Sequence, residues 1–188
     1  DSVLNEQVNR EVADFVSSHD CEVQRFPGKQ VLSCEKLQSK NDLGFVGQVT
    51  QVNTDPILQA LDEGKMPILS STASDSHGVC YNVNADNVAS QVAMALGARR
   101  LVYLSDVPGL LRNPEDPSTL LSSLAISEVK PLEEAGVISA GMLPKVTSAV
   151  EALKAGVNRV HFIDGRMPHS ILLEIFTDQG IGTEIVHA

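Results

Sequence analysis

The chain has 188 residues, 43% of them hydrophobic, and a formal net charge of -10 at pH 7. This length suits one domain or one and a half, and the core must be mainly aliphatic because only 4% of residues are aromatic. The acidic balance disfavours nucleic acid and anionic membrane surfaces as partners, since both prefer a basic face. No apolar run approaches the roughly 20 residues that span a bilayer.

Cysteine and histidine usage excludes two further classes of site. The three cysteines form no CxxC pair, and their odd number argues against a disulfide framework. The five histidines show no HxH or HxxxH spacing, so we expect no metal cage made of protein ligands. The first residues do not resemble a signal peptide. We therefore expect a reducing compartment: the cytoplasm, or a plastid if the source is eukaryotic.

The first third of the chain predicts a helix followed by short strands. Apolar residues recur at helical spacing over residues 2–20. The pieces "CEVQRF" and "QVLSCEKL", joined by residues 26–29, predict a β-hairpin. "GFVGQVTQVN" predicts another strand, and Asp55 followed by Pro56 predicts the start of a helix.

Strands and helices alternate from Met66 onward. The predicted strands are "KMPILSS", "RRLVYLS", "VNRVHFID" and "GTEIV". The predicted helices cover residues 86–96, 127–135 and 142–155 and the piece "MPHSILLEIFT". This alternation predicts an α/β fold with a mainly parallel sheet sandwiched by helices, in which ligands bind at the carboxyl ends of the strands.

A polar segment, "YNVNAD", precedes the helix that starts near residue 86. Asn82 and Asn84 alternate, so their side chains share one face of an extended segment. Asp86 lies near the helix start, where a carboxylate interacts well with the helix dipole and can orient a lysine or Mg²⁺. In the structural alternative, Asn84 caps the helix and Asp86 is an ordinary first-turn acid, but this leaves Asn82 unexplained.

A lysine lies early in the helix of "ISAGMLPKVTSAVEALKAG". The small residues Ser139, Ala140 and Gly141 allow backbone N–H groups to approach an anion at the helix N-terminus. Lys145 opposes the helix dipole, which a bound phosphate would offset; a solvated surface lysine is the alternative. In "LSDVPGLL", a strand ends in Ser-Asp before a Pro-Gly turn, which predicts either a nucleotide-binding edge or a generic turn.

Several long segments together resemble the amino-acid kinase family, most closely its branch that phosphorylates N-acetyl-L-glutamate. They are "LGFVGQVTQVN", "YNVNADNVA", "ALGARRLVYLSDVPGLL", "SAGMLPKV", "HFIDGR" and "IFTDQGIGTEI", and they occur in family order. The resemblance implies an amino-acid kinase-like fold. Residues 1–65 would be the remainder of a substrate-binding lobe with the β-hairpin, and residues 66–188 the nucleotide-binding lobe.

The resemblance also implies an activity and residue roles. ATP with Mg²⁺ would phosphorylate the γ-carboxylate of N-acetyl-L-glutamate in arginine biosynthesis. Lys145 would stabilise the phosphoryl group in transit, and Asp86 would orient the catalytic lysines. Asn82 would hold the α-carboxylate or the amide of N-acetyl-L-glutamate, and Asn84 would also bind the substrate. The nucleotide would bind at Ser105, Asp106, Val107, Gly109, Leu110, Gly141 and Met142. Mg²⁺ would be coordinated chiefly by the phosphates of ATP.

Two family features are not found in this chain: a first strand with a lysine and a Gly-Gly loop, and an arginine that grips the substrate. The chain alone is therefore expected to bind nucleotide weakly and to be inactive. Three alternatives stay open. They are an arginine-sensing kinase-like domain of an acetylglutamate synthase, a kinase acting on aspartate, carbamate or a nucleotide, and a scaffolding module.

The last segment, "LLEIFTDQGIGTEI", looks like that of the arginine-inhibited, hexameric members of the family. Glu174 would meet a guanidinium group, and Gly180 and Gly182 would let backbone carbonyls approach it. The alternative is a plain helix exit with two turn glycines. We thus expect N-acetyl-L-glutamate and ATP as ligands, arginine as an inhibitor, and a homo-oligomer.

Overall fold

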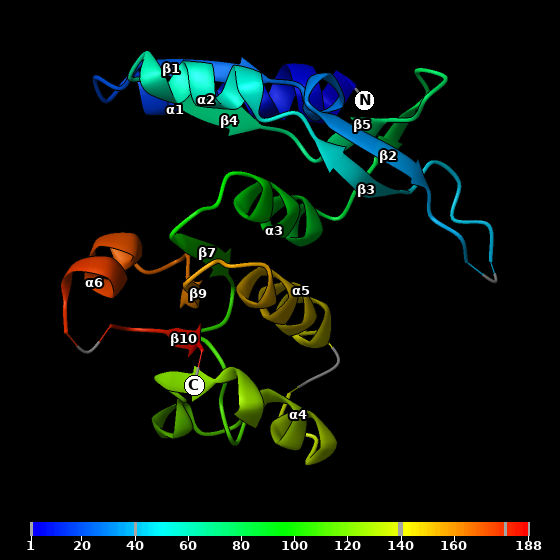
Figure 1. The fold of residues 1–188 in the computed structure, drawn as a ribbon. Coiled ribbons are helices and arrows are strands. Elements are labelled where there is room, and N and C mark those ends of the chain that lie inside the picture. Colours follow the sequence, from blue (N-terminus) through cyan, green and yellow to red (C-terminus); the bar gives the residue numbers. More distant parts are fainter. Residues whose placement is uncertain (1, 40, 139–140, 179, 188) are drawn as a thin grey trace. The chain divides into compact units, whose positions relative to one another are not determined.

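The structure is a computed structural model that describes residues 2–39, 41–138, 141–178 and 180–187. It divides into two compact units, Asp1–Leu96 (unit 1) and Gly97–Ala188 (unit 2) (Figure 1). This division falls later in the chain than the predicted lobe boundary after residue 65, and the assignment of ligands to lobes stays a prediction. None of the helices in the described part of the chain combines the length and apolarity needed to cross a membrane.

Unit 1 starts with the predicted helix, formed by a π-helical stretch, η1 (Val3–Val8), and α1 (Asn9–Ser17). Strand β1 (Val23–Phe26) pairs in parallel with β4 (Met66–Leu69), and α1 packs against both strands. Helix α2 (Asp55–Asp62) has its proline in the first turn and contacts β4.

The predicted hairpin after β1 is wrong. Strand β2 (Leu32–Lys36) pairs antiparallel with β3 (Gly47–Val52) and parallel with β5 (Thr72–Ser74) instead. The physical reason lies at Gly28, in the short 3-10 helix η2 (Gly28–Gln30) between β1 and β2. Its N–H donates to Ser70 Oγ at 2.9 Å, and a Cβ there would lie 2.1 Å from the Ser70 carbonyl oxygen. This close approach directs the chain into a second sheet.

The second sheet of unit 1 has the strand order β3-β2-β5-β6, and β6 (Cys80–Asn82) leads into α3 (Ala85–Ala95). Strands β5 and β6 form an antiparallel pair that the sequence analysis did not predict. The core is largely aliphatic, as the composition predicts, and includes Val31, Leu32, Val49, Ile57, Ala60, Ala73, Val83 and Val88.

Unit 2 is built on a sheet with the order β7-β9-β10-β8. The strands β7 (Arg100–Ser105) and β9 (Arg159–Asp164) are parallel. Strand β10 (Thr183–Val186) is antiparallel to β9 and parallel to β8 (Ser123–Ala125). The sequence analysis missed β8, which follows the 3-10 helix η3 (Pro117–Thr119), because three residues carry too little periodicity.

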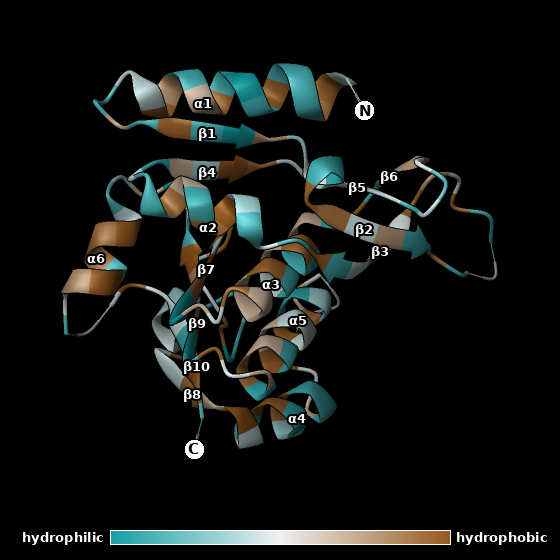
Figure 2. Ribbon diagram, turned by 45° about the horizontal axis from the view of Figure 1, so that its top comes forward, coloured by the Kyte–Doolittle hydropathy of each residue, from teal (hydrophilic) through white to brown (hydrophobic). Residues whose placement is uncertain are grey.

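The helices of unit 2 are α4 (Ile126–Glu134), α5 (Leu143–Lys154) and α6 (Ser170–Phe176). Helices α5 and α6 both contact β9 and lie on opposite sides of it (Figure 1). Figure 2 shows that α6 is mostly hydrophobic. Helices covering sheets that contain parallel pairs confirm the predicted α/β fold class.

Candidate functional site

The two predicted substrate-binding asparagines flank a buried residue at the end of β6. Tyr81 and Val83 are 8% and 3% exposed, whereas Asn82 and Asn84 are both exposed. Because side chains alternate along an extended segment, the two asparagines lie on the same, solvent-facing side. The burial pattern thus agrees with the alternation that the sequence predicts.

Asn84 also has a structural role. Its Oδ1 accepts a hydrogen bond from the backbone N–H of Asn87 at 3.0 Å, which caps α3. Asp86 lies in the first turn of α3 and is half-buried. The capping alternative therefore holds for Asn84, whose NH₂ group is left for a ligand, and it does not account for Asn82.

The structure brings a segment beside Asn82 that the sequence analysis gave no role. The Asn82 N–H donates to the carbonyl oxygen of Phe45 at 2.9 Å, and Val46 forms an isolated parallel bridge with Asn82. The Phe45 ring lies 5.9 Å from the Tyr81 ring, centroid to centroid. The segment of Phe45 and Val46 therefore pairs with the Asn82 backbone, and the Phe45 ring packs on Tyr81. The pairing is long-range, so no local sequence signal revealed it.

In unit 2, charged side chains lie at the carboxyl ends of β7 and β9. Ser105 is paired in register with Asp164, and the Gly165 N–H donates to the Ser105 carbonyl oxygen at 2.8 Å. Asp164 accepts hydrogen bonds from Arg166 Nε at 2.9 Å and Nη2 at 2.8 Å. These bonds lower the pKa of Asp164 to about 2. The sequence analysis quoted "HFIDGR" but assigned its residues no role at this edge.

The exposed Asp106 lies near this edge, because its charge contributes, after that of Asp164, to raising the pKa of Arg166. Beyond it the predicted nucleotide loop turns inward. Gly109 has a φ of +147°, and a Cβ there would lie 2.5 Å from Thr183 Oγ1. The buried Leu110 donates its N–H to that hydroxyl at 2.8 Å. The loop therefore has an open first half, Asp106 and Val107, and an anchored second half.

Lys145 lies in the first turn of α5 and is half-buried. Its Nζ is 6.0 Å from the centroid of the buried Tyr103 ring, which stacks on Phe162. A cation at this distance from an aromatic face is attracted to it, so the fully solvated alternative does not describe Lys145. Met142 precedes the helix and Gly141 faces open space. Ser139 and Ala140 lie outside the described residues.

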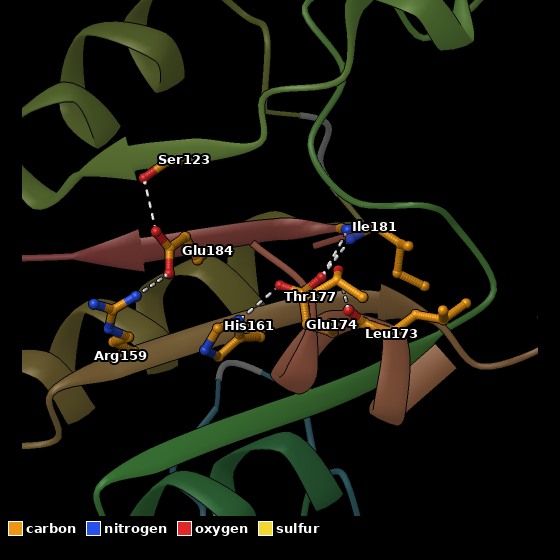
Figure 3. A network of polar contacts seen from close by, with 9 residues as sticks. Ser123, Arg159, His161, Leu173, Glu174, Thr177, Ile181 and Glu184 are labelled. Carbon is orange, nitrogen blue, oxygen red and sulfur yellow. Dashed lines mark hydrogen bonds and ion pairs between the residues drawn. The ribbon is translucent and has the colours of Figure 1, made fainter. Parts of the chain in front are cut away.

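The predicted arginine site lies at a cavity of about 580 Å³ in unit 2, lined by Glu174, Gly180 and Gly182 among others. The Glu174 side chain is 4% exposed. Its Oε1 contacts His161 Nδ1 at 2.7 Å, and its Oε2 accepts from the N–H groups of Ile181 and Gly182 at 2.7 and 2.9 Å (Figure 3). Burial opposes ionisation of Glu174, but these hydrogen bonds outweigh it and lower its pKa.

His161 is a residue of this cavity that the sequence analysis missed. Its side chain is 4% exposed, it lines the cavity, and Nε2 has no hydrogen-bond partner within the described part of the chain. When Nδ1–H donates to Glu174, Nε2 is an acceptor. A buried acceptor next to a carboxylate suits a ligand that carries several N–H donors, as a guanidinium group does.

The described side chains also indicate how a metal ion could be bound. Within residues 2–39, 41–138, 141–178 and 180–187, no three His, Cys, Asp or Glu side chains are grouped to hold one. At the strand ends, Asp106 offers an exposed carboxylate, and the neighbouring Asp164 is bound to Arg166. Such an arrangement fits a Mg²⁺ ion carried mainly by substrate phosphates.

Comparison with known proteins places the chain in a family. The model of the amino acid kinase family matches residues 6–164. The acetylglutamate kinase of Carboxydothermus hydrogenoformans is 43% identical over 192 residues, and that of Thermosynechococcus vestitus 44% identical over 185 residues. The matches cover 96% and 98% of this chain but 65% and 63% of those enzymes, so the chain spans about two thirds of their length.

Solved structures agree. The Streptococcus mutans protein smu.665 superposes with a TM-score of 0.82 at 28% identity, covering all of this chain and 70% of that one. The N-acetylglutamate synthase of Neisseria gonorrhoeae gives a TM-score of 0.81 at 26% identity, covering 96% of this chain and 43% of that one. The chain belongs to the amino acid kinase family.

Proposed function

We propose that the complete protein transfers the γ-phosphate of ATP to the γ-carboxylate of N-acetyl-L-glutamate. The observation that carries this proposal is the identity of 43–44% to acetylglutamate kinases over nearly the whole chain. A carboxylate oxygen forms a bond to the γ-phosphorus while the bond to the bridging oxygen breaks, which yields an acyl phosphate and ADP. The protein needs no covalent intermediate for this, so its task is positioning and charge stabilisation.

The geometry of unit 1 supports a substrate-binding role for the end of β6. The exposed Asn82 carboxamide can both donate and accept hydrogen bonds, which matches an amide or a carboxylate. Val46, which is paired in parallel with Asn82, would offer apolar contact for an acyl group. Asp86, in the first turn of α3, would orient the lysines that bind the phosphates.

The geometry of unit 2 supports a nucleotide-binding role for the ends of β7 and α5. Lys145 is held at a helix N-terminus, where backbone N–H groups favour anions. Its ammonium group would stabilise the phosphoryl group during transfer. Mg²⁺, when bound, neutralises phosphate charge; the exposed Asp106 and the loop to Leu110 would line the nucleotide.

The activity is tested by trapping the acyl phosphate with hydroxylamine in the complete protein. N-acetyl-L-glutamate, aspartate and carbamate are supplied separately with Mg²⁺ and ATP, and ADP release is followed in parallel. Hydroxamate formed only from N-acetyl-L-glutamate is the expected outcome. Hydroxamate formed from aspartate, or ADP released with carbamate and not with N-acetyl-L-glutamate, would assign the protein to another branch of the family.

The arginine-sensing domain of a synthase is the second candidate. The sequence identities argue against it, since the named kinases are 43–44% identical to this chain and the synthase is 26% identical. Lys145 at the start of α5 also disfavours it, because a sensor has no need of a phosphoryl-transfer lysine. Arginine binding without any phosphoryl transfer by the complete protein would favour the synthase.

We further propose that arginine inhibits the enzyme by binding in the cavity at Glu174. The specific observation is the buried His161 Nε2, which has no hydrogen-bond partner among the residues that the structure describes and lies beside an ionised carboxylate. Gly180 has a φ of +61°, and a Cβ there would lie 2.7 Å from Glu174 Oε2, so the loop closes tightly over this carboxylate. Titrating arginine against the kinase rate of the wild type and of Glu174→Ala tests the site. A rate that ignores millimolar arginine would remove this proposal.

Two finer expectations accompany these proposals. We propose a homo-oligomer, because arginine inhibition goes with hexameric members of the family that the last segment resembles. We also propose a cytoplasmic or plastid location, because arginine biosynthesis takes place there. Sedimentation of the complete protein with and without arginine tests the first.

A further inference from the structure

A buried polar network in unit 1 joins the first helical stretch to the short strand β5. Asn5 of η1 is only 1% exposed, although its side chain is polar. Its Oδ1 accepts hydrogen bonds from two buried hydroxyl groups, that of Ser70 and, at 2.9 Å, that of Thr72. An amide oxygen has two lone pairs, so Asn5 fixes both hydroxyl groups at once.

Backbone donors orient the same two hydroxyl groups from another side. The Gly28 N–H donates to Ser70 Oγ at 2.9 Å, and the Lys29 N–H donates to Thr72 Oγ1 at 3.3 Å. Because an amide oxygen can only accept, the hydrogen of each hydroxyl group points to Asn5. An apolar residue at position 5 would take this acceptor away from two buried donors, which is costly.

The network reaches the predicted substrate-binding asparagine through one further residue. Thr72 is the direct partner of Asn82 in the antiparallel register of β5 and β6. Residues paired in this way point to the same face of a sheet, and their Cβ atoms are about 5 Å apart. The Val83 N–H also donates to the Ser71 carbonyl oxygen at 3.0 Å. The segment that Asn5 holds therefore positions the backbone of Asn82 and Val83.

Strand β5 makes few backbone contacts that could fix its position in the sheet. It has three residues, and its register with β2 consists of the single pair Ser33 and Ser74. A fully satisfied buried polar network makes such a segment more rigid. The bonds from Asn5 therefore contribute to the position of β5 and of β6 beside it.

We propose that Asn5 is a positioning residue for Asn82 and acts through the hydroxyl groups of Ser70 and Thr72. The inference rests on the proposed role of Asn82 in binding N-acetyl-L-glutamate. Without Asn5, the start of β5 would shift and displace the Asn82 carboxamide with it. Hydrogen bonds depend steeply on distance and angle, so a small displacement of this carboxamide weakens its hold on the substrate.

The test compares Asn5→Ala with Asn9→Ala in the complete protein. Asn9 is a second buried asparagine of the same helical stretch, but its Nδ2 donates to the Ile68 carbonyl oxygen of β4 and its Oδ1 accepts from Arg25 Nε of β1. Its loss removes buried hydrogen bonds and leaves those to β5 in place. Hydroxylamine trapping gives kcat and the KM values for N-acetyl-L-glutamate and ATP, at a temperature where circular dichroism shows the proteins folded.

A second pair of variants, Thr72→Val and Thr72→Ser, tests the same network from β5. Valine keeps the approximate volume of the threonine side chain and removes its hydroxyl group, whereas serine keeps the hydroxyl group. This pair decides the question even where Asn5→Ala does not fold.

We expect Asn5→Ala and Thr72→Val to raise the KM for N-acetyl-L-glutamate by about tenfold and to change the KM for ATP by less than about twofold, the pattern of lost substrate binding. Asn9→Ala and Thr72→Ser should change both KM values by less than about twofold. An unchanged KM for N-acetyl-L-glutamate in Asn5→Ala or in Thr72→Val, or an equal rise in Asn9→Ala, would overturn the inference and leave the kinase function standing. A wild type that forms no acyl phosphate from N-acetyl-L-glutamate would overturn the proposed function, and this inference with it.

Discussion

The backbone N–H of Leu110 donates a 2.8 Å hydrogen bond to the hydroxyl of Thr183, 73 residues further along the chain. Thr183 is fully buried, so this bond joins the loop after β7 to the start of β10 inside the core of unit 2. It explains why the second half of the predicted nucleotide loop is rigidly attached. The position of Asp106 and Val107 therefore depends on a residue near the end of the chain.

Thr183→Val should destabilise the protein by about 1–3 kcal/mol, because the buried N–H of Leu110 loses its acceptor while the side-chain volume is kept. Urea unfolding measures this. The control is Thr147→Val, whose exposed hydroxyl bonds only within α5 and whose loss should cost less than about 0.5 kcal/mol. Equal effects of the two variants would contradict the anchoring role of Thr183.

Lys145→Ala in the complete protein should lower kcat by roughly 100- to 1,000-fold and change nucleotide affinity far less. This is the pattern for a donor that acts mainly in the transition state. Lys154→Ala is the matched control, because Lys154 is an exposed lysine in the last turn of the same helix. The kinase rate and a nucleotide titration separate the two effects. An unchanged kcat would return Lys145 to a structural role over the Tyr103 ring.

Gly28→Ala should destabilise unit 1 by about 3 kcal/mol or more, at the upper end of overpacking effects. The added methyl group would meet the carbonyl oxygens of Ser70 and Thr72 at 2.1 and 2.2 Å, and backbone cannot move aside as a side chain can. Gly141→Ala serves as the control, because a Cβ there meets nothing within 4 Å. Denaturation midpoints of the two variants provide the measurement, and a mild effect at Gly28 would contradict the observed crossing between sheets.

Glu174→Gln should remove a pH-dependent part of the stability. The pKa of Glu174 is lowered on folding, so its ionised form stabilises the folded state fully above the unfolded value of about 4.3. That contribution is lost as pH falls through the lower, folded pKa. The difference in unfolding free energy between wild type and variant should therefore be constant from pH 7 to 5 and shrink below about pH 4.

Unfolding in urea at a series of pH values from 7 to 3 provides this measurement. Glu133→Gln, at an exposed position of α4, reports the effect of removing one negative charge from the surface. A difference between wild type and Glu174→Gln that does not change with pH would show that the two oxygens of Glu174 act through shape alone.

The sequence by itself determined the local structure and the family. Asn84 as a helix cap, the proline in the first turn of α2, and the alternation of Asn82 and Asn84 about Val83 all follow from short-range hydrogen bonding and side-chain period. The ordered motifs from about residue 43 to residue 185 were sufficient for the amino acid kinase family.

Only the tertiary structure decided which distant segments meet. The turn at residues 26–29 has the composition of a hairpin, yet β1 pairs with β4, because Gly28 packs against the Ser70 backbone. The neighbouring positions of Arg100 and Arg159 depend on the register of two strands separated by four helical or strand elements. The partners of Glu174 likewise come from a strand and a loop. Register and buried hydrogen bonds are long-range properties, which local propensity and periodicity do not encode.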